Sequence, residues 1–356
     1  MDTVAILGAG AWGTALAVHL ARTPSAPSIR LWARDPGQVR ALTTTRENKR
    51  YLPGVALDSA VTVSADLQES LAGASLLLVA TPIGALIEVV ALARDRAPHP
   101  RPSPRGRGET SESLRDFRGW PPLFWLGKGF VATHDARGVA LAHRIVAPLW
   151  PASIGVISGP SFAEEVARSL PTAVAVAATD AFAAQEVGRR LRGETLRVYV
   201  SDDITGVEVG GAVKNVLAIA AGASDGLGFG HNARAALITR GLAETGRLSA
   251  ALGGKRETLM GLAGLGDLVL TCTSDLSRNR RVGLALAKGQ PLSAILSELG
   301  HVAEGVAAAR DVHALFRSSG VDMPICNAVY RVLYEDLPPR RAVETLLARE
   351  PGPEFQ

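Results

Sequence analysis

Lysine is scarce in this sequence of 356 residues. Of its 38 basic side chains, five are lysine and the rest are arginine. An arginine effectively never loses its proton, whereas a lysine does so when its surroundings lower its pKa. Each lysine is therefore a candidate for proton chemistry, with codon usage as the alternative explanation. The five are Lys49, Lys128, Lys214, Lys255 and Lys288.

Cysteine is scarcer still, and long apolar runs are missing. Two cysteines exclude a disulfide framework, and neither stands in a CxxC pair or a Cys/His metal spacing. We therefore expect a reducing cytoplasm and no metal centre. Residues 71–93 form the most apolar stretch, but polar residues, proline and glycine interrupt it, which indicates strand, turn and helix rather than a membrane span. No export signal is evident, since Asp2 stands where such a signal carries a basic residue.

The composition is that of a globular protein of about two domains, with 47% apolar and 20% charged residues. The net charge of +4 is weak evidence for a polyanionic partner. Residues 94–122 are rich in proline and arginine and have no apolar periodicity until Leu123. We expect this segment to be a surface insertion, with an anion or nucleic-acid contact as the less favoured alternative.

Short apolar runs alternate with helical patterns over the first 200 residues, and helical periodicity dominates afterwards. This order predicts a Rossmann-type, doubly wound, mostly parallel α/β sheet in residues 1–200 and an all-α domain in residues 201–356. Expected strands are 4–7, 29–33, 76–80, 123–126, 154–157 and 195–200. Expected helices include 14–22, 206–223, 232–246, 278–288 and 302–318.

A glycine fingerprint stands between the first expected strand and the first expected helix. Gly8, Gly10 and Gly13 form the sequence GAGAWG. In such a motif the first glycine makes a tight turn, the second lets backbone approach a pyrophosphate, and the third lets helix and strand pack closely. The helix N-terminus receives the negative charge. The position of the motif predicts a dinucleotide site rather than an ordinary turn.

The end of the second strand bears on which dinucleotide binds. An acidic residue there binds the adenosine ribose 2′-hydroxyl, whereas an arginine accommodates a 2′-phosphate. The chain offers Arg34 and then Asp35. This order favours NADP(H) and leaves NAD(H) open, and a solvated surface charge is the alternative for Arg34.

Two lysines lie where a ligand is expected. Lys128 follows a predicted parallel strand, at the sheet edge where open α/β folds bind ligands. Lys214 lies in an otherwise apolar helical segment. Burial there would lower its pKa toward the range that general acid-base catalysis needs, and a surface lysine is the equal alternative.

Two further segments suit an anionic ligand. In the sequence SGPSFA, Ser161 and neighbouring backbone N–H groups follow a strand and precede a helix. In the run from Gly261 to Asn279, Asp267 can bind a hydroxyl or orient a lysine, and Ser277 can cap a helix that begins at Arg278. Arg278 and that helix N-terminus suit a phosphate.

These motifs together resemble the bacterial NAD(P)-dependent glycerol-3-phosphate dehydrogenases. The resemblance covers residues 1 to about 337 outside the insertion. It rests on GAGAWGTALA, LWARDP, NKRYLPG, LGKGF, ISGPSFAEEVA, VEVGGAVKNVLAIAAGASDGLGFGHNARAALITRGLAE, MGLAGLGDLVLTCTSDLSRNRRVG and VAEGV.

The resemblance implies a cytoplasmic enzyme that interconverts sn-glycerol 3-phosphate and dihydroxyacetone phosphate for glycerophospholipid synthesis. It uses NADP(H) or NAD(H), and a homodimer is left open. The resemblance implies neither a nucleic-acid partner nor a membrane span. Lys214 matches the family's proton acceptor, and Lys128 matches a residue that touches cofactor and substrate. The substrate positions match Gly159, Ser161, Asp267, Ser277, Arg278 and Asn279, and the cofactor positions match Trp12, Arg34, Tyr51, Ala163, Arg278, Val302 and Glu304.

Departures from the family pattern concern two positions and the insertion. Ala11 replaces the usual serine of the fingerprint, which removes a hydroxyl contact to the pyrophosphate but keeps the backbone contact. His231 stands where the family commonly has aspartate.

Two rival hypotheses for the function remain. One is a two-domain dehydrogenase for a sugar acid or hydroxyacyl thioester, and the other is a nucleotide-sensing or nucleic-acid-binding protein that uses the arginine-rich segment.

Overall fold

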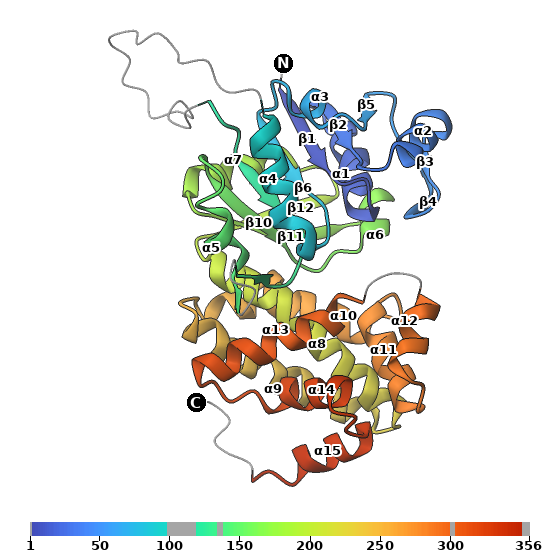
Figure 1. Cartoon of the computed structure of the whole chain (residues 1–356), viewed down its shortest axis with the longest axis vertical. Coiled ribbons are helices and arrows are strands. Elements are labelled where there is room, and N and C mark those ends of the chain that lie inside the picture. Colours follow the sequence, from blue (N-terminus) through green and yellow to red (C-terminus); the bar gives the residue numbers. More distant parts are fainter. Residues whose placement is uncertain (1, 98–118, 134–137, 300–302, 351–356) are drawn as a thin grey trace. The chain divides into compact units, whose positions relative to one another are not determined.

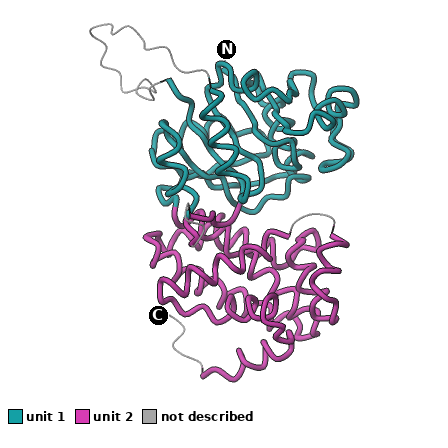
Figure 2. Tube along the Cα trace, in the orientation of Figure 1, with its two compact units in different colours: residues 1–127, 141–204 teal, residues 128–140, 205–356 magenta. Residues whose placement is uncertain are grey.

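The computed structural model describes residues 2–97, 119–133, 138–299 and 303–350. The chain divides into two compact units (Figure 2). The sheet unit comprises residues 1–127 and 141–204, and the helical unit comprises residues 128–140 and 205–356. Residues 128–140, which the sequence placed with the sheet, therefore belong with the helices, because their contacts lie there.

An eight-stranded sheet forms the middle of the sheet unit (Figure 1), in the order β12-β11-β10-β7-β6-β1-β2-β5. Neighbouring strands are parallel except β10 and β11. The strands are β1 (Thr3–Leu7), β2 (Ser28–Trp32), β5 (Val61–Ser64), β6 (Leu76–Val79), β7 (Leu123–Trp125), β10 (Ile154–Ser158), β11 (Thr172–Ala178) and β12 (Leu196–Ser201). A small hairpin pairs β3 (Glu47–Asn48) with β4 (Leu52–Ala56). The predicted mostly parallel sheet is confirmed.

Both faces of the sheet are buried, as continuous apolar strands require. Val4 and Ile6 of β1 belong to a large core cluster on one face, and Ala5 and Leu7 on the other face are equally inaccessible. The covering helices are α1 (Ala11–Ala21), α2 (Pro36–Thr45), α3 (Leu67–Leu71), α4 (Leu86–Arg96), α5 (Ala142–Val146), α6 (Ala163–Ala167) and α7 (Ala181–Leu191), with a 3₁₀ turn η1 (Ile83–Ala85) before α4.

The two ends of the proline- and arginine-rich segment have regular structure or defined hydrogen bonds, so the expected surface insertion is shorter than residues 94–122. Helix α4 continues to Arg96 and ends at Ala97, because the residue before a proline disfavours helical geometry. At the other end, the Pro122 carbonyl accepts a hydrogen bond from Leu77 N, and the Pro121 carbonyl accepts one from the Trp150 indole at 2.9 Å. Residues 98–118 lie outside the described residues.

The helical unit consists of eight α-helices within the described residues, together with the hairpin of β8 (Val131–Ala132) and β9 (Val139–Ala140). The helices are α8 (Ile204–Gly226), α9 (Gly230–Ala251), α10 (Asp267–Thr273), α11 (Arg278–Ala287), α12 (Leu292–Leu299), α13 (Glu304–Ser319), α14 (Pro324–Tyr334) and α15 (Pro339–Leu347). A 3₁₀ turn η2 (Glu257–Met260) and a π-turn η3 (Leu262–Gly266) precede α10. The predicted helical C-terminal region is confirmed.

Helix α8 is long and apolar enough to cross a membrane by length and composition alone. In the structure, 89% of its most apolar window is buried inside the protein. It therefore has the character of a core helix, and Lys214 lies near its middle.

Candidate active site

Three ionisable side chains meet inside the helical unit. The Lys214 amine donates to Oδ1 of Asp267 at 2.5 Å, and the Lys128 amine donates to Oδ2 of the same carboxylate at 2.5 Å. The side chains are 9% (Lys214), 14% (Lys128) and 1% (Asp267) exposed. Their formal charges sum to +1, so the cluster suits an anionic or carbonyl-bearing ligand.

Thr271 completes this cluster. Asp267 is the first residue of α10, and Thr271 lies one turn later on the same helix face. The Thr271 hydroxyl donates to the Asp267 backbone carbonyl at 2.6 Å and accepts from the Lys214 amine at 3.0 Å. The amine is thus held by two side chains of α10.

Close backbone packing brings α10 to Lys214. A Cβ on Gly210, one turn before Lys214, would lie 2.5 Å from the Ala263 carbonyl of η3, and one on Gly264 would lie 2.1 Å from the Leu259 carbonyl. Only glycine allows these approaches. The π-turn η3 then delivers the chain into α10 with Asp267 at its start, and π-turns are common at functional sites.

Burial lowers the pKa of Lys214 from 10.5 to about 8, because desolvation disfavours the ammonium. The Asp267 carboxylate opposes this shift, and the positive charge of Lys128 reinforces it. An amine with a pKa near 8 both donates and accepts a proton close to neutral pH.

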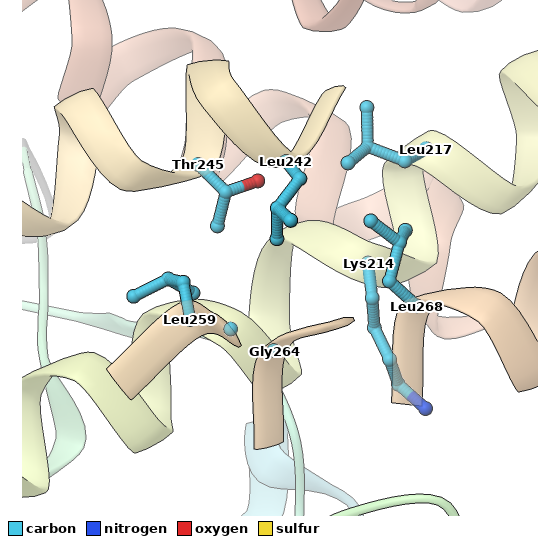
Figure 3. Close-up of a pocket in the computed structure, with 8 residues that line it drawn as sticks. Lys214, Leu217, Leu242, Thr245, Leu259, Gly264 and Leu268 are labelled. Atoms are coloured by element: carbon cyan, nitrogen blue, oxygen red, sulfur yellow. The ribbon is translucent and has the colours of Figure 1, made fainter. Parts of the chain in front are cut away.

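The stem of Lys214 is fixed by apolar neighbours. Figure 3 shows it beside Leu268, with the amine pointing away from Leu217 and Leu242. The space that these side chains line has no room for a water-sized molecule. The stem is therefore packed, and only its amine end is available for chemistry.

Asn279 joins three helices beside this cluster. Its Nδ2 donates to Oδ1 of Asn215 at 3.0 Å, and its Oδ1 accepts from the backbone N–H of Gly305 in the first turn of α13 at 3.0 Å. The Nδ2 of Asn215 is buried and has no hydrogen-bond partner within the described residues. Such a donor, one residue from Lys214, fits a ligand oxygen.

Reciprocal glycines set the distance between α8 and α11. A Cβ on Gly222 of α8 would lie 2.0 Å from the Arg280 carbonyl, and one on Gly283 of α11 would lie 2.0 Å from the Ile219 carbonyl. The two helix backbones are therefore in direct contact. This contact fixes where α11 begins, and with it the position of Asn279.

The N-terminus of α11 has the expected cap. Ser277 Oγ accepts from the Arg280 backbone N–H at 3.2 Å, so the predicted cap and the predicted helix start at Arg278 are confirmed. Arg278 is exposed, whereas Arg280 is buried and donates to Asp225 at 2.7 Å and to Asp275 at 2.6 Å. Arg280 is therefore occupied in the fold, and Arg278 is accessible to an anion.

His231, one of the departures from the family pattern, lies in the first turn of α9. Its Nδ1 accepts from the Arg234 guanidinium at 2.8 Å, and Arg234 also donates to Asp225 at 2.9 Å. The imidazole thus takes an acceptor position in the network that anchors Arg280.

The glycine loop of the sheet unit has the geometry of an anion site. Gly8 has a φ of +117°, and a Cβ on Gly13 would lie 1.8 Å from the Gly8 carbonyl. A Cβ on Gly10 would meet nothing within 4 Å, so that side of the loop is open. Helix α1 begins at Ala11 without a side-chain cap, which leaves its first N–H groups to a ligand. These features fit a dinucleotide pyrophosphate.

Two amides that the sequence analysis did not single out brace this loop. The Ala9 carbonyl accepts from Asn48 Nδ2 at 2.9 Å and from Gln38 Nε2 at 2.6 Å. Asn48 is 2% exposed and also donates to the Thr14 hydroxyl at 2.7 Å. The motif NKRYLPG therefore supports the glycine loop through Asn48.

At the end of β2, the two candidate charges have different roles. Asp35 caps α2, since its Oδ1 accepts from the Gly37 backbone N–H at 2.8 Å. Arg34 is exposed and forms an ion pair with Glu88 of α4 at 3.0 Å. The acid next to Arg34 is thus engaged by the helix that follows it.

The remaining predicted residues lie in one unit or the other. In the sheet unit, Gly159 has a φ of +145°, the Ser161 hydroxyl donates to the Gly159 carbonyl at 2.9 Å, and Ala163 begins α6. Trp12 packs against the core, and the Arg50 guanidinium lies 5.0 Å from the Tyr51 ring centre. Glu304 begins α13 in the helical unit, and Val302 lies outside the described residues.

Comparison with known proteins gives consistent results over both units. A model described as the N-terminus of NAD-dependent glycerol-3-phosphate dehydrogenase matches residues 3–184, and one described as its C-terminus matches residues 203–344. Glycerol-3-phosphate dehydrogenase (NAD(P)+) of Thiobacillus denitrificans is 50% identical over 98% of this chain and 99% of its own. That of Aromatoleum aromaticum is 51% identical over 98% of each chain. A crystal structure of glycerol-3-phosphate dehydrogenase from Coxiella burnetii matches with a TM-score of 0.85 and 42% identity, over 98% of this chain and 99% of that one.

Proposed function

Because the chain belongs to the NAD-dependent glycerol-3-phosphate dehydrogenase family, we propose that it interconverts sn-glycerol 3-phosphate and dihydroxyacetone phosphate with NAD(H) or NADP(H). The observation that carries this assignment is the Asp267 carboxylate bound by buried Lys214 and partly buried Lys128. A carbonyl reduction needs a proton donor at the oxygen and cationic surroundings for a phosphate-bearing substrate. The cluster has both features.

Lys214 is the proposed proton donor and acceptor. In the reducing direction its ammonium gives a proton to the C2 carbonyl oxygen while a hydride reaches C2, and the C2 hydroxyl results. In the oxidising direction the neutral amine takes that proton. A pKa of about 8 keeps the amine mostly protonated at neutral pH, which favours the reducing direction.

Asp267, Lys128 and Thr271 are proposed to hold the reacting groups. Asp267 binds one amine with each of its two carboxylate oxygens, which holds the Lys128 and Lys214 side chains in place. Lys128 adds a second positive charge for the substrate oxygens. The Thr271 hydroxyl accepts a second hydrogen bond from the Lys214 amine.

The substrate phosphate is proposed to bind at the start of α11. Exposed Arg278, the capped helix N-terminus and the adjacent Asn279 supply positive charge and N–H donors. Gly159 and Ser161 are proposed substrate contacts from the sheet unit. The unpartnered Nδ2 of Asn215 is a further candidate donor to a substrate oxygen.

A bound nicotinamide dinucleotide supplies or accepts the hydride. Its pyrophosphate is proposed to bind at Gly8, Gly10, Ala11, Trp12 and Gly13, with Arg34 near the adenosine ribose. Lys128, Tyr51, Ala163, Arg278, Val302 and Glu304 are the other proposed cofactor contacts. The loop fits this role because Gly10 is open and α1 has no side-chain cap. A cytoplasmic location and a homodimer are part of the same proposal.

A steady-state assay tests the function directly. Purified protein should oxidise NADPH or NADH when dihydroxyacetone phosphate is added, as read from the loss of reduced-nicotinamide absorbance. Lys214→Ala should lower kcat by about 10²- to 10⁴-fold, the contribution of a general acid, and leave nucleotide binding intact. Lys288→Ala, which changes an exposed lysine at the end of α11, is the matched control. Full activity in Lys214→Ala would refute the role of Lys214, and no activity in the unaltered protein would refute the function.

A further inference from the structure

An ion pair joins two segments on either side of the glycine loop. Arg34 follows the carboxyl end of β2, and Glu88 lies in the first turn of α4, the helix after β6. Strands β2 and β6 are the two neighbours of β1, which leads into Gly8. The guanidinium Nη2 and the carboxylate Oε1 are 3.0 Å apart. The pair therefore lies at the carboxyl edge of the sheet, where dinucleotides bind.

We propose that Glu88 is a specificity-determining residue that weakens the preference for a 2′-phosphorylated dinucleotide by competing for Arg34. This inference rests on the proposed function, because it assumes that the adenosine half of the cofactor lies beside Arg34. The Glu88 carboxylate occupies one side of the guanidinium that a 2′-phosphate would bind. The pair must open, or accept a third charge, before the phosphate is bound.

Charge gives the competition its direction. A phosphate monoester carries about −1.5 to −2 at neutral pH, so it would approach a guanidinium whose charge Glu88 already balances. The 2′-hydroxyl of NAD(H) is neutral and can donate a hydrogen bond to a carboxylate. Glu88 therefore opposes NADP(H) and tolerates NAD(H).

The neighbouring acid is not available for this role. Asp35 is held by α2, since it accepts from the Gly37 N–H at 2.8 Å. The carboxylate that meets Arg34 thus comes from α4, about 50 residues further along the chain, and not from the end of β2, where a dinucleotide fold usually places it.

The effect should be modest, because the two side chains are 60% and 57% exposed and water screens their interaction. We expect Glu88→Gln to tighten NADPH binding by roughly 1.5- to 5-fold at low salt, with NADH binding unchanged or slightly weaker. Raising the salt concentration should shrink the difference, since screened charges compete less.

Binding measurements without substrate test the inference. Dissociation constants for NADPH and NADH are measured by calorimetric titration for the unaltered protein, Glu88→Gln, Arg34→Gln and the double variant. Arg34→Gln should weaken NADPH binding, and Glu88→Gln in that background should recover only part of the lost affinity, because the cation that binds the 2′-phosphate is absent. The matched control is Glu335→Gln, which removes a half-exposed carboxylate paired with Arg331 on α14 and makes the same change in net charge.

The outcomes separate this inference from the proposed function. A larger NADPH-to-NADH affinity ratio in Glu88→Gln, but not in Glu335→Gln, supports it. An unchanged ratio, or a loss of NADPH affinity because Glu88 merely positions Arg34, overturns it while the dehydrogenase assignment stands. Failure of the unaltered protein to bind either nucleotide overturns both.

Discussion

Replacing Asp267 by asparagine should damage the candidate site in a way that its geometry makes specific. The side chain is 1% exposed, and its two oxygens each accept from a lysine amine at 2.5 Å. Asparagine keeps the shape but removes the charge between the two amines. Breaking a buried ion pair by removing one partner costs about 3–5 kcal/mol of folding free energy, so the variant should unfold at a lower temperature.

The pH dependence should change as well. Lys214 has a pKa of about 8, and the Asp267 carboxylate raises it against desolvation and against Lys128. Reduction by the unaltered protein should therefore fall as pH rises through about 8, because the ammonium is the proton donor. Without the carboxylate, the pKa of Lys214 falls further. The fall in rate at high pH, which is the upper limb of the rate profile, then begins at a lower pH. For each unit by which the pKa of Lys214 lies below the assay pH, the protonated fraction of the amine drops about tenfold.

The assay is the kcat/KM of dihydroxyacetone phosphate reduction as a function of pH, measured beside thermal unfolding. Glu244→Gln is the matched control. Glu244 is also 1% exposed in the helical unit, but its oxygens accept from backbone N–H groups of Ile325 and Cys326. That control should leave the upper limb in place. An Asp267→Asn enzyme with the same limb as the unaltered protein would refute the coupling of Asp267 to Lys214.

Three other changes probe the supports of the fold and the site. Gly13→Ala should abolish dinucleotide binding and lower the melting temperature, because its Cβ would lie 1.8 Å from the Gly8 carbonyl; normal binding in a titration would contradict the tight turn. Asn48→Ala should cost about 1–3 kcal/mol in urea unfolding and weaken nucleotide affinity, since the Ala9 carbonyl and the Thr14 hydroxyl each lose a buried donor; unchanged values would show that the brace is dispensable. Burial raises the pKa of Glu244 from 4.5 to about 7, so the stability it contributes is present at low pH and is lost as pH rises through about 7. Glu244→Gln should flatten that loss in unfolding free energies compared between about pH 5 and about pH 8, and an unchanged slope would exclude Glu244 as its source.

The sequence predicted those parts of the fold that local patterns encode. The β1 strand, the glycine loop and α1 are contiguous, and each residue type there has one structural reason. The antiparallel strand β11 (Thr172–Ala178) was missed, since its alternation is between alanine and valine, and alanine has little strand preference. Strand β5 (Val61–Ser64) was missed because threonine and serine alternate with its two valines, so it lacks the continuous apolar run of the strands that were predicted.

The candidate site could be predicted only as a set of residues. Lys128 and Lys214 stood out by composition. Their binding to one carboxylate could not be predicted, because Asp267 lies 139 residues after Lys128 and 53 residues after Lys214 in the chain. Thr271 could have been predicted as a neighbour of Asp267, because it lies four residues later on the same helix. Glu88 could not have been predicted, since no pattern in α4 links it to Arg34.

The long separation between Lys128 and Asp267 also has a consequence for biosynthesis. Lys128 leaves the ribosome 139 residues before its partner, and domains generally fold as they emerge, N-terminal first. The segment 128–140 must therefore wait, unpaired with its own unit, until the helices beyond residue 205 are made. A prematurely terminated chain can complete the glycine loop and still lack the carboxylate that holds both amines. Incomplete products of translation that end before Asp267 would then keep the glycine loop but would lack the arrangement that moves a proton.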